Sequence, residues 1–201
     1  LFRAVGPLRY TRRMTDPTAA ADDVADLRLT LPDGRTLAYT LCGIEGGQPL
    51  LRIPGTPGCR WSIRSDRSPW LARNLRAITT ERPGFGASTR LPGRGFAEHS
   101  DDLARLLDHL GITRLHAGLG GSLGGMQALQ WALDDPQAMT LCAPICASSE
   151  LSAMNIAFST VAREAIMRDP GFQGGAYHDS PPGPNIGLAV ARMMAHITYL
   201  S

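Results

Sequence analysis

The stretch Gly120-Gly121-Ser122-Leu123-Gly124-Gly125 decides the fold, because it places one serine among small residues where a predicted strand gives way to a predicted helix. Residues 114–119 are mostly apolar and predict a short buried strand, and residues 126–133 are strong helix formers. A serine on so sharp a turn needs neighbours without a Cβ two positions away on either side, and both of those residues are glycine. The pattern predicts that Ser122 is a nucleophile at a strand-to-helix elbow.

Two other uses of a glycine-rich loop stay open at this point, namely a purely structural turn and a phosphate-binding loop. No lysine follows the glycines, and the run has no G-x-G-x-x-G spacing. The flanking strand and helix favour the nucleophilic elbow over both alternatives.

The composition predicts one α/β domain in the cytoplasm. The chain has 201 residues, 43% of them hydrophobic, and a formal net charge of +2, and all 20 basic residues are arginine. We expect no nucleic-acid partner because the arginines form no basic helix, and no membrane span because no run of about 18 apolar residues occurs. The spacings of Cys42, Cys59, Cys142 and Cys146 fit neither a zinc site nor a small disulfide scaffold, which predicts reduced thiols and no metal.

Residues 1–26 have the composition of a flexible N-terminal lead. Residues 1–13 hold four arginines and no acidic residue, and the first methionine is Met14. We expect Met14 to be the natural start, with a transit peptide as the alternative.

The apolar periodicity after this lead predicts alternating strands and helices. The turn Pro32-Asp33-Gly34 predicts a hairpin, and later strand–helix–strand units predict parallel pairing. One helix is expected to be capped by Ser100 and closed by Gly111. The expected strands are 27–31, 36–40, 50–53, 77–80, 114–119 and 139–145, and the other expected helices are 70–75, 126–133, 151–167 and 186–200.

This order, with the stretches Pro54-Gly55-Thr56-Pro57-Gly58 and Glu81-Arg82-Pro83-Gly84-Phe85-Gly86-Ala87-Ser88, resembles the α/β-hydrolase superfamily over residues 27–147. The resemblance implies a mostly parallel sheet with flanking helices. It also implies that the backbone N–H groups of Thr56 and Leu123 form an oxyanion hole. The second stretch would shape the pocket and carry no chemistry.

A narrower resemblance begins at Leu106. The stretches Leu106–Ile112, Gly120–Ala132 and Gly187–Ser201 are similar in order and spacing to homoserine O-acetyltransferases. That resemblance implies transfer of an acetyl group from acetyl-CoA to Ser122 and then to the hydroxyl of L-homoserine, in methionine biosynthesis. It implies no permanently bound cofactor, acetyl-CoA as co-substrate, and a homodimer.

Arg192 corresponds to the family arginine that binds the homoserine carboxylate. Residues 188–194 are apolar on nearly every face of the expected helix, so an arginine there is expected to be partly buried beside an anionic partner. A structural ion pair within the fold is the alternative reading.

A catalytic base is harder to assign. In this fold the triad acid and base follow the nucleophile, and only His178 and His196 follow Ser122. Neither corresponds to the family base, so we expect the final core strands to be missing and residues 148–201 to form the start of a helical lid. The alternatives are an esterase that uses water as acceptor and an inactive fragment without the triad Asp and His.

Overall fold

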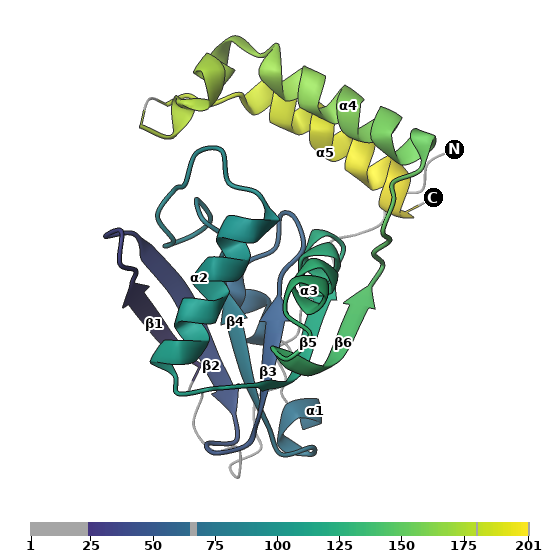
Figure 1. Cartoon of the computed structure of the whole chain (residues 1–201). Coiled ribbons are helices and arrows are strands. Elements are labelled where there is room, and N and C mark those ends of the chain that lie inside the picture. Colours follow the sequence, from purple (N-terminus) through teal and green to yellow (C-terminus); the bar gives the residue numbers. More distant parts are fainter. Residues whose placement is uncertain (1–23, 65–67, 180, 201) are drawn as a thin grey trace, which may run out of the picture. The chain divides into compact units, whose positions relative to one another are not determined.

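The computed structural model describes residues 24–64, 68–179 and 181–200, which fall into two compact units divided between Ala147 and Ser148 (Figure 1). Most of the expected N-terminal lead lies outside the described residues. Its last two residues are ordered, because the first strand begins at Ala25.

The first unit is built on a six-stranded sheet in the order β1-β2-β4-β3-β5-β6. β1 pairs antiparallel with β2, and β2 with β4, whereas the pairs β3–β4, β3–β5 and β5–β6 are parallel. The expected hairpin and the expected parallel pairing are thus both confirmed. The strands are β1 (Ala25–Thr30), β2 (Thr36–Gly43), β3 (Gln48–Ile53), β4 (Leu75–Thr80), β5 (Leu115–Gly121) and β6 (Met139–Ile145).

Side chains that alternate along the strands fill two apolar clusters. Helices α2 (Phe96–His109) and α3 (Leu123–Asp134) cover one face (Figure 1), where Leu106 and Trp131 pack with Leu51 of β3. Leu50, the neighbour of Leu51, belongs to the smaller cluster, against which Trp70 packs. A central parallel sheet is buried on both faces, as this one is. Parallel pairing holds the ends of β3 and β5 side by side.

Two expected elements are wrong in detail. The expected helix over 70–75 is a single turn, α1 (Ser68–Leu71), and Leu75 already begins β4; a 3₁₀ helix, η1 (Arg60–Arg64), precedes it. Ser100 does not cap α2, which begins one turn earlier. Its first turn is stabilised by Glu98, whose carboxylate accepts the Gly95 N–H at 2.7 Å.

The second unit consists of helices α4 (Ala153–Met167) and α5 (Asn185–Leu200), with two 3₁₀ helices, η2 (Pro170–Gly175) and η3 (Tyr177–Asp179), between them. The Asp169 carboxylate accepts the N–H groups of Gly171 and Gly187, each at 2.8 Å, and thereby links η2 to the start of α5. These hydrogen bonds hold the pKa of Asp169 below its usual value. A Cβ on Gly187 would overlap the carbonyl oxygen of Ala165, so α4 and α5 pack closely at this point.

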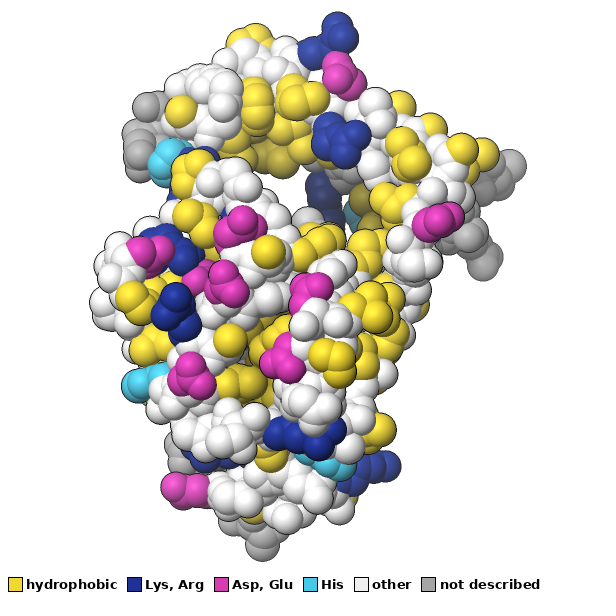
Figure 2. Space-filling model, viewed as in Figure 1, with side chains coloured by type: hydrophobic (Ala, Val, Ile, Leu, Met, Phe, Trp, Pro, Cys, Tyr) yellow, Lys and Arg dark blue, Asp and Glu magenta, His cyan; other side chains and the backbone are white. Residues whose placement is uncertain are grey.

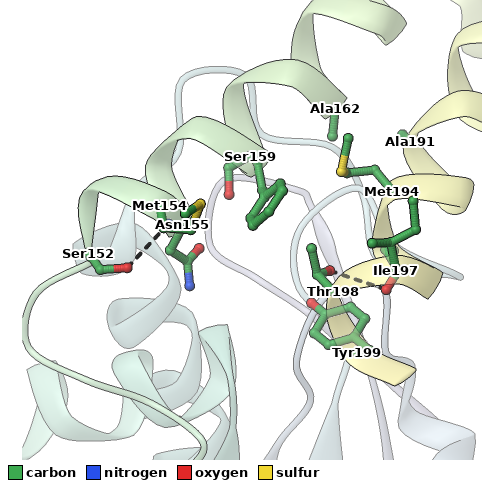
Figure 3. A pocket seen from close by; sticks show the side chains of 12 residues that line it. Ser152, Met154, Asn155, Ser159, Ala162, Ala191, Met194, Ile197, Thr198 and Tyr199 are labelled. Atoms are coloured by element: carbon green, nitrogen blue, oxygen red, sulfur yellow. Dashed lines mark hydrogen bonds between the residues drawn. The ribbon is translucent and has the colours of Figure 1, made fainter. Parts of the chain in front are cut away.

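A hollow of about 470 Å³ lies between α4 and α5 (Figure 3). Phe158 and Met194 line it from the two helices. No residue of α4 is fully buried, and hydrophobic side chains reach the surface of both units (Figure 2).

Candidate active site

Ser122 lies between the end of β5 and the start of α3, with φ 52° and ψ −125°. This is the left-handed region, which non-glycine residues adopt at a cost of about 1–3 kcal/mol when the surroundings hold them there. The surrounding hydrogen bonds do so, because the Ser122 N–H donates to Ile145 at 2.8 Å and the Ser122 carbonyl accepts from Gly125 at 2.9 Å. The side chain is exposed at the carboxyl edge of the sheet, as the sequence predicts.

The glycines around the elbow are needed for close packing. A Cβ on Gly120 would overlap the carbonyl oxygen of Gly124, and a Cβ on Gly124 would overlap that of Ile53. Gly121, by contrast, has open space where its Cβ would lie. The expectation that Gly120 and Gly124 must lack a Cβ is confirmed.

The loop 54–59, between β3 and η1, passes directly against the elbow. A Cβ on Gly55 would lie 2.8 Å from the Gly121 carbonyl oxygen and 3.4 Å from the Ser122 Cβ. Thr56 follows at once, and in the described part of the chain neither its N–H nor that of Leu123 donates to a protein acceptor. Both residues line the same pocket of about 400 Å³.

This pocket combines aromatic, amide and cationic side chains from three segments. Phe85 and Arg82 come from the turn after β4, and Phe96 from the start of α2. Gln127 of α3 donates through Nε2 to the Phe96 carbonyl at 3.0 Å and to Ser100 Oγ at 2.7 Å, which joins α3 to α2 beside the pocket. The remaining lining residues are Thr56, Arg94, Gly95, His99 and Leu123.

His99 is the buried titratable group of this pocket. Its side chain is 2% exposed, and neither ring nitrogen has a hydrogen-bond partner among the described residues. Burial, together with the nearby charge of Arg82, lowers the pKa of His99 to about 4. The imidazole is therefore neutral at neutral pH.

A family model for the alpha/beta hydrolase fold matches residues 48–200, which include β3, β5, the Ser122 elbow and the second unit. The chain belongs to the alpha/beta hydrolase fold family.

This chain has two curated relatives whose names are those of homoserine acyltransferases. It is 56% identical over 107 residues to a homoserine O-succinyltransferase of Nocardioides sp., an alignment that covers 51% of this chain and 29% of the relative. It is 57% identical over 98 residues to a homoserine O-acetyltransferase of Gluconobacter oxydans, covering 49% of this chain and 25% of the relative. The chain thus spans about a quarter of the length of these relatives, and the predicted resemblance to this group is confirmed.

A solved structure shares the fold at lower identity. The homoserine O-acetyltransferase from Staphylococcus aureus superposes with a TM-score of 0.66 at 22% identity, covering 89% of this chain and 58% of that one. At this identity the likeness extends to the fold alone.

Arg192 lies in the second unit of the chain, on α5, and the expectation of partial burial is wrong. Its side chain is exposed and has no ion-pair partner among the described residues. The reason is that α5 packs mainly on α4 within its unit, so only one of its apolar faces is covered. Arg192 lines a small hollow of about 190 Å³ with His196 and Tyr199.

The Ser122 hydroxyl makes no hydrogen bond with any described residue of the chain. His178 and His196, which follow it in sequence, both belong to the second unit. His99, which the sequence ranks below them, lines the pocket beside Leu123. No described histidine is therefore placed as a base by hydrogen bonding to Ser122.

Within the described ranges no cluster of His, Cys, Asp and Glu side chains could hold a metal ion. None of the helices in those ranges is long and apolar enough to cross a membrane.

Proposed function

We propose that this protein is an acyltransferase that moves an acetyl group from acetyl-CoA to the hydroxyl of L-homoserine, through an acyl-enzyme on Ser122. The observation that carries the proposal is the left-handed Ser122 at the β5–α3 elbow, in a chain 56–57% identical to homoserine O-acyltransferases over about half its length. The product is an activated ester of homoserine, which places the reaction in methionine biosynthesis. No cofactor is permanently bound, and acetyl-CoA is a co-substrate.

In the first half-reaction the Ser122 oxygen attacks the thioester carbonyl. The new C–O bond forms and the C–S bond breaks, and coenzyme A leaves as the thiol with the proton that a base takes from Ser122. In the second, the homoserine hydroxyl attacks the seryl ester and its proton returns to Ser122. Two transfers through one covalent intermediate give ping-pong kinetics.

Thr56 and Leu123 stabilise the oxyanion through their backbone N–H groups. Support comes from the pocket that both residues line and from the lack of a protein acceptor for either amide. Loss of one such donor costs about 100- to 1,000-fold in kcat in enzymes of this kind.

A second candidate donor is a succinyl thioester. The described lining of the pocket contains Arg94 but no aspartate or glutamate, which favours an acyl group that ends in a carboxylate. A comparison of acetyl-CoA with succinyl-CoA as donors, by their kcat/KM values, decides between the two.

Arg192 binds the homoserine carboxylate. Its guanidinium is exposed, without an ion-pair partner in the described residues, and is free to form a bidentate pair. Arg192→Gln is expected to raise KM for homoserine at least about 10-fold while leaving the rate of Ser122 acylation unchanged, because acylation precedes homoserine binding.

The test of the function is release of coenzyme A by the purified protein with and without L-homoserine. We expect release that requires homoserine, yields O-acylhomoserine, and is lost in Ser122→Ala. Ser149→Ala is the matched control, since Ser149 is exposed and makes no hydrogen bond among the described residues. Hydrolysis of p-nitrophenyl acetate by Ser122 with no response to homoserine would instead identify an esterase.

A further inference from the structure

The side-chain hydrogen bonds of Arg82 to described residues all go to one short loop. Its Nη1 donates to the Pro54 carbonyl at 2.7 Å, and its Nη2 donates to the Gly55 carbonyl and to Thr56 Oγ1, each at 2.9 Å. The guanidinium also lies 4.7 Å from the centre of the Phe85 ring. Three consecutive residues of the loop 54–59 are thus held by one side chain.

The surroundings of Arg82 are unfavourable for a charge. Its side chain is 8% exposed, and no described carboxylate pairs with it. Burial lowers its pKa from the ordinary value. A buried cation without a counter-ion is a poor source of stability, so the three hydrogen bonds to the loop are its clearest contribution.

The preceding residue holds the other end of the same loop. The Glu81 carboxylate, 2% exposed, pairs with Nη1 of Arg60, the first residue after the loop, and accepts the Ala87 N–H at 2.8 Å. Arg60 Nη2 also donates to Asp26 at 2.9 Å. Glu81 and Arg82 therefore fasten both ends of the loop to the end of β4, and we call this pair the loop anchor.

The anchored loop carries the Thr56 N–H to the elbow. A Cβ on Gly55 would lie 3.4 Å from the Ser122 Cβ, and a tight turn closes the loop through a hydrogen bond from Gly58 N–H to the Gly55 carbonyl at 2.8 Å. An oxyanion donor acts only when it lies about 2.7–3.1 Å from the developing charge, so a small displacement of this loop removes its effect.

We propose that Arg82 is a positioning residue for acyl transfer, which fixes the Thr56 N–H at the oxyanion position through its hydrogen bonds to Pro54, Gly55 and Thr56, with Glu81 fixing the far end of the loop through Arg60. The proposal rests on the proposed function for its kinetic consequence, but the anchoring of the loop does not depend on which reaction Ser122 performs. In this proposal Arg82 acts on the reaction through the loop that it holds, because its hydrogen bonds go to Pro54, Gly55 and Thr56.

The first test is hydrogen exchange of the Gly58 N–H, the hydrogen-bonded amide that closes the loop, in the purified protein. Arg82→Ala is expected to speed exchange there at least about 10-fold, because the loop loses three hydrogen bonds. Arg35→Met is the matched control. It removes another strongly hydrogen-bonded arginine, paired with Asp102 away from the pocket, and is expected to leave exchange in the loop unchanged.

The second test is the split between kcat and KM in acyl transfer. Arg82→Ala is expected to lower kcat about 10- to 100-fold with KM within about 3-fold, and added guanidinium ion is expected to restore part of kcat. Arg82→Lys keeps the charge but not the planar fork, so its kcat is expected to lie between those of the wild type and Arg82→Ala. This variant replaces Arg82→Ala in the test if Arg82→Ala does not fold.

The outcomes separate the two proposals. A protein without homoserine acyl transfer contradicts the proposed function, while altered exchange in the loop still supports the anchor. Unchanged exchange in Arg82→Ala and Arg82→Lys, or equal changes in Arg35→Met, overturns the anchor. If the protein is an acyltransferase and the Arg82 variants change KM alone, the anchor is also overturned.

Discussion

The elbow glycines show at residue scale how backbone contact determines the site. Gly124→Ala is expected to destabilise the protein by about 1–3 kcal/mol or more, because its Cβ would overlap the carbonyl oxygen of Ile53. Gly121 directly precedes the same serine and has open space where its Cβ would lie, so Gly121→Ala is expected to change stability by less than about 0.5 kcal/mol. Denaturant unfolding of the two variants measures the difference, and equal stabilities would contradict the packing described for the elbow.

His99 gives the protein a pH-dependent stability. Its pKa is about 4 in the folded protein and 6.5 in the unfolded chain, so the unfolded chain binds more protons between these values. The stability from burying the neutral ring is complete above about pH 6.5 and is lost as the pH falls toward 4, by roughly 3 kcal/mol.

Urea unfolding at several pH values checks this. His99→Gln is expected to show a shallower loss of stability between pH 6.5 and 4 than the wild type. His109→Gln, on the exposed side of the same helix, is expected to keep the wild-type slope. An identical slope in all three proteins would show that His99 does not titrate as a buried group.

Some site residues could be predicted from sequence and others could not. Ser122 and its glycines are predictable because the turn imposes a fixed local spacing. Arg82 belongs to a stretch that is expected only to shape the pocket, and His99 precedes the nucleophile and is not expected to be the base. Their contacts reach residues 26 to 28 positions away or a buried pocket, and no periodicity encodes either. The apolar sequence neighbours of Arg192 predict partial burial. They do not reveal which face of the helix is covered, so the prediction is wrong.

At the scale of elements, the pair Arg35–Asp102 ties the β1–β2 hairpin to α2. The guanidinium donates to both carboxylate oxygens, at 2.8 and 2.7 Å, and the Asp102 side chain is 3% exposed. The Asp102 interaction, with that of Asp33, raises the pKa of Arg35 above its ordinary value.

Arg35→Met is expected to cost about 3–5 kcal/mol of unfolding free energy, because it leaves the Asp102 carboxylate buried and unpaired. The double variant Arg35→Met/Asp102→Leu is expected to recover much of that loss, since no uncompensated charge remains. Chemical denaturation of the single and double variants gives the coupling energy. Additive losses would mean that the pair does not join the two elements energetically.

The order and type of most elements follow from sequence, because strand and helix periods differ and the hairpin turn has its own residues. The boundaries depend on contacts that lie outside that pattern. Ser100 looks like a cap but is buried and bonded to Gln127, while the first turn of α2 is stabilised by Glu98 instead. The expected helix at 70–75 fails because Leu75 pairs into the sheet opposite Gln48.

At the scale of the whole molecule, the two units differ in how much they bury. The apolar cores lie in the first unit, and α4 of the second has no fully buried residue. Amides of β3, β4 and β5 are therefore expected to exchange with solvent at least about 100-fold more slowly than those of α4 and α5. Exchange followed by mass spectrometry measures this, and uniform protection across both units would contradict it.

The central claim is that Ser122 carries the acyl group between a coenzyme A thioester and homoserine. The most direct measurement is intact and peptide mass spectrometry of the protein mixed with acetyl-CoA or succinyl-CoA, before and after L-homoserine is added. The account predicts one acyl group on the Ser122 peptide, absent in Ser122→Ala, that disappears as O-acylhomoserine forms. O-acylhomoserine formed with no adduct, or with the adduct on another residue, would contradict it.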